Sequence, residues 1–93
     1  MDRETKRLVK ARLRRVAGQV AAIERMVEED RYCVDVLNQV AAVQAALGKV
    51  GAMVLGAHVE TCVYDAMLRG DGKEKRKKIE ELVGIFDRFG MRS

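Results

Sequence analysis

Three side chains of this sequence could bind a soft metal ion: its two cysteines and its single histidine. Cys33 stands at one end of a long apolar stretch, and His58 and Cys62 stand near the other end, four residues apart. Residues four apart on a helix lie on one face, one turn from each other. Two thiolates and one imidazole form a soft set of three ligands, which favours Cu(I) and permits Zn(II) if water or a fourth group completes the site. The spacing alone also fits packing residues of a helix, so both interpretations stay open at this point.

The stretch that carries these residues, 33–68, predicts one long helix. Its apolar residues alternate spacings of four and three, as expected for a seam that is buried against other helices. The seam consists of Val36, Val40, Val43, Leu47, Val50, Val54 and Ala57. Along such a helix Cys33 and His58 would lie about 37 Å apart, at a rise of about 1.5 Å per residue. We therefore expect Cys33 to share an ion with His58 and Cys62 only across two chains.

The composition is typical of an all-α protein. The 93 residues are 48% hydrophobic and 4% aromatic and contain no proline, which favours helices over sheets. Apolar periodicity and turn residues predict helices at about 3–29, 32–69 and 73–89, so that each protomer has three helices with a long central one. We expect a single domain over residues 1–93. A central helix of about 54 Å would project beyond a compact monomer of this length, so we expect oligomers.

The first and third predicted helices carry apolar stripes of their own. The stripe of the first helix consists of Val9, Leu13, Val16, Val20, Ile23 and Val27, and that of the third consists of Ile79, Leu82, Val83 and Phe86. The first stripe repeats on the same heptad as the central seam, so these two helices should pack together. The short third helix should dock on the longer pair.

Basic residues are concentrated at the start of the first helix. The chain has a net charge of +4, and residues 3–15 hold seven lysines and arginines against one acid, whereas residues 24–30 hold four acids against one arginine. This order opposes the helix macrodipole, so helix stability does not explain it. A surface for a polyanion such as nucleic acid would explain it, and a solvated basic face is the alternative.

Several classes of protein are not supported by the sequence. The charged N-terminus lacks the apolar run of a secretory signal, which predicts a cytoplasmic protein whose cysteines bind metal, react or are merely buried. The stretch 36–59 is apolar enough to suggest a membrane span, but its amides and its histidine would be costly in lipid, so we expect no membrane. No glycine-rich nucleophile turn or phosphate loop is present, and we expect no enzyme activity.

A longer pattern resembles the copper-sensitive operon repressor family (CsoR), part of a wider group that includes nickel/cobalt and formaldehyde sensors. The segments that carry the resemblance are RLRRVAGQV at 12–20, RMVE at 25–28 and YCVDVLNQVAAVQAAL at 32–47. It extends from about Lys10 to Phe89. It implies an all-α protein in which two protomers pair their long helices antiparallel and two dimers form a tetramer. It also implies a repressor that binds operator DNA in the apo form and releases it when Cu(I) binds.

By position, the resemblance implies that Cu(I) is bound by Cys33 of one protomer and by His58 and Cys62 of the other. Tyr32 and Glu81 match residues proposed to couple the ligated histidine to the third helix. A ligating imidazole usually donates its other N–H to an outer acceptor, which fixes its orientation.

The resemblance also implies contacts with operator DNA. Arg12, Arg15 and Lys49 match the DNA contacts of the family, and Lys10 and Arg14 should add attraction to phosphate. No helix-turn-helix is recognisable, so the basic faces of the first and central helices would form the DNA surface.

Other signals remain open for the same set of residues. A persulfide-sensing branch of the group keeps both cysteines and lacks the histidine, so a sulfur signal that links Cys33 to Cys62 is one alternative. A helical copper buffer or scaffold without DNA function is another. The nickel/cobalt branch typically uses further histidines, and square-planar nickel would need a fourth nitrogen or sulfur donor that this chain lacks. The formaldehyde branch would carry a carboxylate in place of Cys62.

Overall fold

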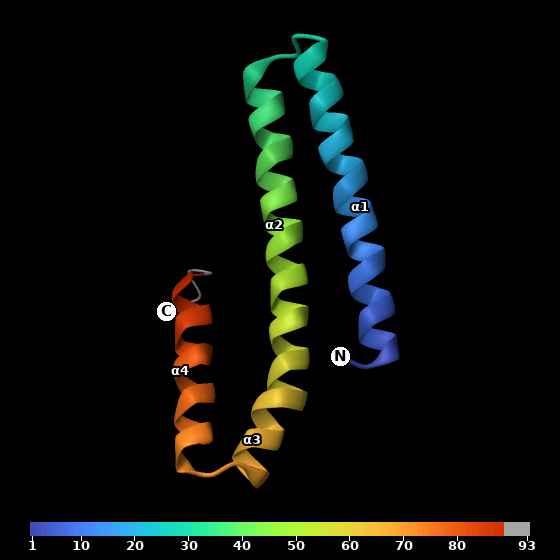
Figure 1. Ribbon diagram of the computed structural model, residues 1–93. Coiled ribbons are helices and arrows are strands. Elements are labelled where there is room, and N and C mark those ends of the chain that lie inside the picture. The colour runs from blue at the N-terminus through green and yellow to red at the C-terminus, as the bar shows by residue number, and fades with distance from the viewer. Residues whose placement is uncertain (89–93) are drawn as a thin grey trace. The chain divides into compact units, whose positions relative to one another are not determined.

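The computed structural model describes residues 1–88, which are almost entirely helical (Figure 1). The elements are α1 (Arg3–Glu28), α2 (Cys33–His58), a π-helical segment η1 (Val59–Val63), α3 (Tyr64–Arg69) and α4 (Gly72–Arg88). The described part of the chain contains no β-strand, and the predicted all-α class is confirmed. The predicted end of the last helix at residue 89 lies outside the described residues.

The predicted central helix, 32–69, is divided in the structure. The α-helical pattern stops at His58, continues as π-helix over Val59–Val63 and resumes in α3. The hydroxyl of Thr61 donates a hydrogen bond of 2.7 Å to the carbonyl of Ala57, the acceptor that an α-helix assigns to the backbone N–H of residue 61. Such side-chain bonds compete with the backbone ladder. The helix is therefore wider in the segment that carries Cys62.

Residues 2–54 form one compact unit, in which α1 and the first part of α2 run antiparallel, side by side (Figure 1). Asp2 caps α1, because its carboxylate accepts a hydrogen bond of 2.7 Å from the N–H of Thr5, which lowers the pKa of Asp2. Asp30 adopts a left-handed backbone conformation, with φ of 53°, in the turn between the helices. Val9 and Val16 of α1 and Val43 and Val50 of α2 are buried.

The two predicted seams are only partly buried in this unit. Leu13, Val20 and Val27 on α1 and Leu47 and Val54 on α2 are 40 to 61% exposed, which differs from the prediction. Two helices bury only the narrow strip between them, and the flanking positions of a heptad need a further helix to cover them. The heptad pattern thus includes apolar residues that α1 and α2 of one chain cannot bury between them.

The second unit begins at Leu55 and contains η1, α3 and α4. These three elements contact one another, and Val63 and Ala66 are their buried residues. Gly70 ends α3 by donating a backbone hydrogen bond of 2.8 Å to Ala66, and Asp71 caps α4 by accepting one of 2.8 Å from the N–H of Glu74. In the predicted stripe of the third helix, Leu82 is half-buried, whereas Ile79, Val83 and Phe86 are exposed.

One helical run, Cys33–Arg69, is long and apolar enough to cross a membrane, with a mean hydropathy of 1.6. The core helix of a soluble protein meets the same criterion, so the feature is weak support for a membrane span. The expected absence of a membrane stays a prediction.

Gly70 gives a test of the turn between α3 and α4. A Cβ at this position would lie 2.6 Å from the carbonyl oxygen of Ala66, whereas a Cβ on Gly84, within α4, meets nothing within 4 Å. We expect Gly70→Ala to lower the free energy of unfolding by at least about 1 kcal/mol. We expect Gly84→Ala to raise it by up to about 1 kcal/mol through helix propensity. Thermal unfolding followed by circular dichroism measures both, and equal shifts for the two variants would contradict the described turn.

Candidate metal centre and nucleic-acid interface

The three candidate metal ligands lie at the two ends of α2 and just beyond it. Cys33 is the first residue of α2 and His58 is its last, while Cys62 lies within η1. Both cysteines are exposed free thiols, and His58 is half-buried. An α-helix of 26 residues is about 39 Å long. Within residues 1–88 no three histidine, cysteine or acidic side chains gather closely enough to bind an ion, so the three-ligand site stays a prediction that requires two chains.

Cys33 opens onto a shallow pocket at the turn between α1 and α2. The pocket is lined by Val27, Asp30, Arg31, Cys33, Val36 and Leu37. The guanidinium of Arg31 lies 4.0 Å from the carboxylate of Glu29, and Val27 and Leu37 are largely exposed. The thiol is thus accessible and has both apolar and charged neighbours.

His58 directly precedes the π-helical segment, and Cys62 lies within it. The hydroxyl of Thr61, which donates to Ala57, also lies 3.7 Å from the Sγ of Cys62. Sequence reasoning assigned Thr61 no role. The sequence feature that could have identified Thr61 is its position directly before Cys62, a candidate ligand. π-Helical turns occur frequently at functional sites, which is consistent with a candidate ligand in η1.

Tyr32 and Glu81, the predicted neighbours of the ligands, have local partners in the structure. The carbonyl of Tyr32 accepts backbone hydrogen bonds from Asp35 and Val36 at the start of α2, and its side chain is exposed. The carboxylate of Glu81 lies 3.6 Å from the Nζ of Lys78, one turn earlier on α4. This i, i+3 pair is half-exposed, and sequence reasoning did not identify it although the spacing is typical. The proposed coupling roles of Tyr32 and Glu81 stay predictions.

Three of the predicted DNA contacts come together in one groove between α1 and α2. The groove is lined by Arg12, Arg15, Val16, Gln19, Ala42, Ala45, Ala46 and Lys49. Because the helices are antiparallel, the middle of α1 faces the middle of α2, and the small alanines of α2 leave room between the basic side chains. The three basic residues have no carboxylate partner among residues 1–88. They are therefore free to bind an anion.

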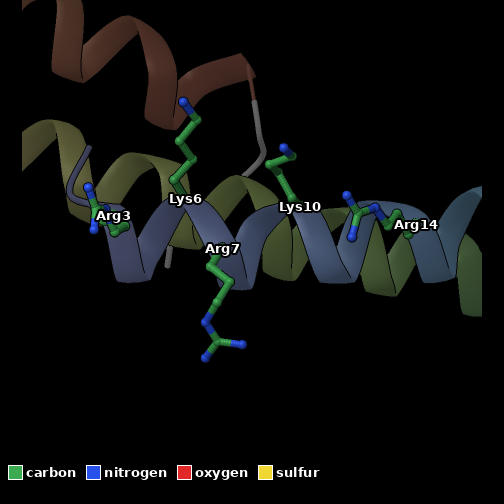
Figure 2. A pocket seen from close by; sticks show the side chains of 5 residues that line it. All are labelled: Arg3, Lys6, Arg7, Lys10 and Arg14. Carbon is green, nitrogen blue, oxygen red and sulfur yellow. The ribbon is translucent and has the colours of Figure 1, made fainter.

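The other two predicted DNA contacts, Lys10 and Arg14, do not line this groove. They line a second surface formed by α1 alone, together with Arg3, Lys6 and Arg7 (Figure 2). Arg7 donates hydrogen bonds to both carboxylate oxygens of Glu4, which lowers the pKa of Glu4 and raises that of Arg7. This exposed pair stabilises the start of α1 at pH values above the ordinary pKa of glutamate, and that stabilisation is lost as the pH falls through the lowered pKa.

The comparison with protein families identifies the chain. The model of the family described as "Metal-sensitive transcriptional repressor" matches residues 5–88. The chain belongs to this family. A copper-sensing transcriptional repressor CsoR of Bacillus subtilis is 49% identical over 78 residues, which cover 84% of this chain and 74% of the relative. The copper-sensing transcriptional repressor RicR of Mycobacterium tuberculosis is 52% identical over 66 residues, which cover 67% of this chain and 69% of the relative.

Solved structures of the family share the fold. The crystal structure of the copper-sensing repressor CsoR with Cu(I) from Geobacillus thermodenitrificans gives a TM-score of 0.85 at 36% identity, covering 97% of this chain and 91% of that one. The structure of the nickel-responsive transcriptional regulator InrS gives a TM-score of 0.72 at 35% identity, covering 89% of this chain and 90% of that one. The resemblance to copper-sensitive operon repressors is thus confirmed. Since the fold also serves a nickel-responsive regulator, the donor atoms must decide which metal a family member binds.

Gln19 is a residue of the groove that sequence reasoning missed. Its Oε1 atom is shielded from solvent and accepts no hydrogen bond from the described residues, and a buried unpaired acceptor costs about 1–3 kcal/mol. The sequence feature that could have identified Gln19 is an amide side chain close to the apolar stripe of the first helix. We expect Gln19→Met, which keeps the volume and removes the acceptor, to raise the midpoint of thermal unfolding. A lower midpoint would show that a group outside this chain satisfies Oε1 in the assembled protein.

Proposed function

We propose that this chain is a Cu(I)-responsive transcriptional repressor, which binds operator DNA without metal and releases it when Cu(I) binds. The observation that carries the proposal is the donor set. The only thiols and the only imidazole of the chain, Cys33, His58 and Cys62, lie at the ends of α2 and in η1. Soft thiolate ligands select Cu(I), and the relatives named above are copper-sensing repressors.

The residues present fit a Cu(I) site shared between two protomers. Both thiols are free and accessible, and no acidic side chain joins them to make a harder site among residues 1–88. Cys33 of one protomer and His58 and Cys62 of the other would supply three soft donors. The bound ion would supply strong bonds to thiolate and imidazole. The site would thus join the start of α2 in one chain to η1 in the other.

The assembly would be a homodimer that pairs into a homotetramer. The exposed apolar residues on α1 and α2, such as Leu13, Val20 and Leu47, support it, because contiguous apolar surface of this kind marks association sites. In this assembly, other copies would cover the apolar surface of the helical run Cys33–Arg69, so that no membrane would be required to bury it. The protein would then be a cytoplasmic, non-catalytic regulator, with residues 1–93 acting as one functional domain.

The groove of Arg12, Arg15 and Lys49 would bind operator DNA. Arginine can read guanine through two hydrogen bonds and can also bind phosphate, and both arginines are exposed in the groove. At the metal site, the carboxylate of Glu81 would accept a hydrogen bond from the second N–H of the ligated His58. The Nζ of Lys78 lies 3.6 Å from one oxygen of that carboxylate, and the other oxygen could accept the hydrogen bond from His58.

Cys33→Ala tests the metal site. We expect the parent protein to bind about one Cu(I) per protomer and to release a duplex of its own promoter when loaded, because shared ligands link the two chains. The variant should bind the same duplex with unchanged affinity and should neither retain Cu(I) against a chromogenic chelator nor release the DNA. Fluorescence anisotropy and chelator competition measure the two properties.

Retention of both Cu(I) affinity and release by Cys33→Ala would refute the proposed site. Treatment with polysulfide gives the contrast with a sulfur signal. If an interchain link between Cys33 and Cys62 appeared in mass spectra together with loss of DNA binding, while Cu(I) left the DNA bound, the signal would be a sulfur species.

A further inference from the structure

The first three turns of α1 carry a basic surface that is distinct from the groove. We name it the outer basic face. It consists of Arg3, Lys6, Arg7, Lys10 and Arg14 (Figure 2). At 3.6 residues per turn, these five positions fall within an arc of about 100° around the helix. Arg12 and Arg15, which line the groove, are centred about 150° away on the same helix. The basic start of α1 is therefore two surfaces that point in nearly opposite directions.

The outer basic face is exposed and mostly uncompensated. All five residues are exposed, and only Arg7 has a carboxylate partner, Glu4, among the described residues. Four cations thus have nothing to neutralise them in the part of the chain that the structure describes. Arg3 and Lys6, at the start of α1, also oppose the helix macrodipole, whose effect of about 0.3–1 kcal/mol per charge falls off beyond the first turn. Helix stability therefore does not account for the face, and a polyanionic ligand would.

The same side of α1 changes character beyond Arg14. Further along this side come Ala17 and Ala21, and then Glu24, Arg25 and Glu28, where acids outnumber bases. The basic part is thus bounded, and it extends along about 16 Å of helix from Arg3 to Arg14. A DNA strand presents one phosphate per about 3.4 Å of its axis, so a face of this length matches about five phosphates of one strand.

We propose that the outer basic face is a second binding surface for the phosphate backbone of duplex DNA, which contacts a stretch of DNA other than the one in the groove of Arg12, Arg15 and Lys49. The inference rests on the proposed function for the identity of the polyanion. Because the two surfaces point in nearly opposite directions, one straight duplex cannot touch both on a single α1. The outer face would bind the flanking part of a bent duplex or a second duplex.

The composition of the face favours duplex backbone over other polyanions. It contains no aromatic residue, and proteins that bind single strands rely on aromatic side chains for stacking on bases. It also contains no large apolar residue to enter a lipid interface beside the charges. Lysines and arginines without base-reading partners supply attraction that does not depend on sequence.

The test compares metal-free variants of the whole protein. The triple variant Lys6→Gln, Lys10→Gln, Arg14→Gln removes three cations of the outer face. The single variants Arg14→Gln and Arg25→Gln form a matched pair, since both change an arginine on the same side of α1 and only Arg14 belongs to the face. Fluorescence anisotropy at several salt concentrations gives the affinity for a duplex of the protein's own promoter and for a scrambled duplex of equal length.

We expect the triple variant to reduce the slope of log affinity against log salt by about 2 to 3, at about 0.9 per lost phosphate contact. The reduction should be equal on both duplexes, and the preference for the promoter should stay within twofold of the parent. Arg14→Gln should reduce the slope by about 0.9 and Arg25→Gln should leave it unchanged. The midpoint of thermal unfolding should stay close to that of the parent in the triple variant, because the three side chains are exposed and have no ion-pair partner among residues 1–88.

An unchanged slope in the triple variant, with a parent that binds the promoter in a salt-dependent way, would overturn the outer face and leave the proposed function intact. An equal loss in Arg25→Gln would overturn it too, since the effect would then be one of net charge. If the parent bound both duplexes equally but the triple variant lost slope, the face would stand and the proposed repressor would not. A parent that bound neither duplex at low salt would overturn both.

Discussion

The length of α2 is the constraint on which the rest of the protein depends. A 26-residue helix holds its ends about 39 Å apart, and the chain places one soft ligand at the first residue and the other two at and just after the last. Within one chain the helix keeps Cys33 apart from His58 and Cys62, so these candidate ligands can meet only when two chains associate. The proposed metal site would therefore form between copies, and sensing and assembly would depend on the same helix.

The small size of the core leads to the same conclusion. In the unit of residues 2–54, two antiparallel helices bury four valines, and much of the remaining seam is exposed. Burial of apolar side chains drives both folding and association, so a pair of helices with this pattern gains most of its burial from other copies. The groove of Arg12, Arg15 and Lys49 lies between these same helices. A change in how α2 packs would therefore alter the spacing of the cations that we propose to bind DNA.

Much of this could be predicted from the sequence, because it depends on local rules. The glycines at 70 and 72 mark a helix break by turn chemistry, and the heptad spacing identifies which helices pack together, whereas the cap that Asp2 places on α1 was not predicted. The meeting of Arg12 and Arg15 with Lys49 follows from an antiparallel pair joined by a short turn, in the way that the family resemblance implied. Counting residues gave the separation of Cys33 from His58 along the helix, but the predicted helix over 32–69 did not place His58 at a helix end.

Other features could not be predicted, for physical reasons. The π-helical segment contains a hydrogen bond from the Thr61 hydroxyl to the carbonyl of Ala57, and apolar periodicity encodes neither feature. A heptad pattern cannot tell which of its positions the same chain covers, so the exposure of Leu13 and Leu47 was not foreseen. Residues 3–15 were counted as one basic cluster, although their angular positions already separated Arg14 from Arg15. The ion pair of Glu81 with Lys78 and the unpaired oxygen of Gln19 are side-chain details of the folded chain.

Complementation between two inactive variants tests whether the metal site is completed only by two chains. Cys33→Ala and Cys62→Ala, each alone, should bind no Cu(I) at the site. When the two are unfolded together, mixed one to one and refolded, half of the dimers contain both chains, and each such dimer holds one complete site. Cu(I) binding should return to about a quarter of the parent capacity, as expected for a two-fold symmetric interface. No recovery in the mixture, with mixed dimers shown by native mass spectrometry, would contradict a site shared between two chains.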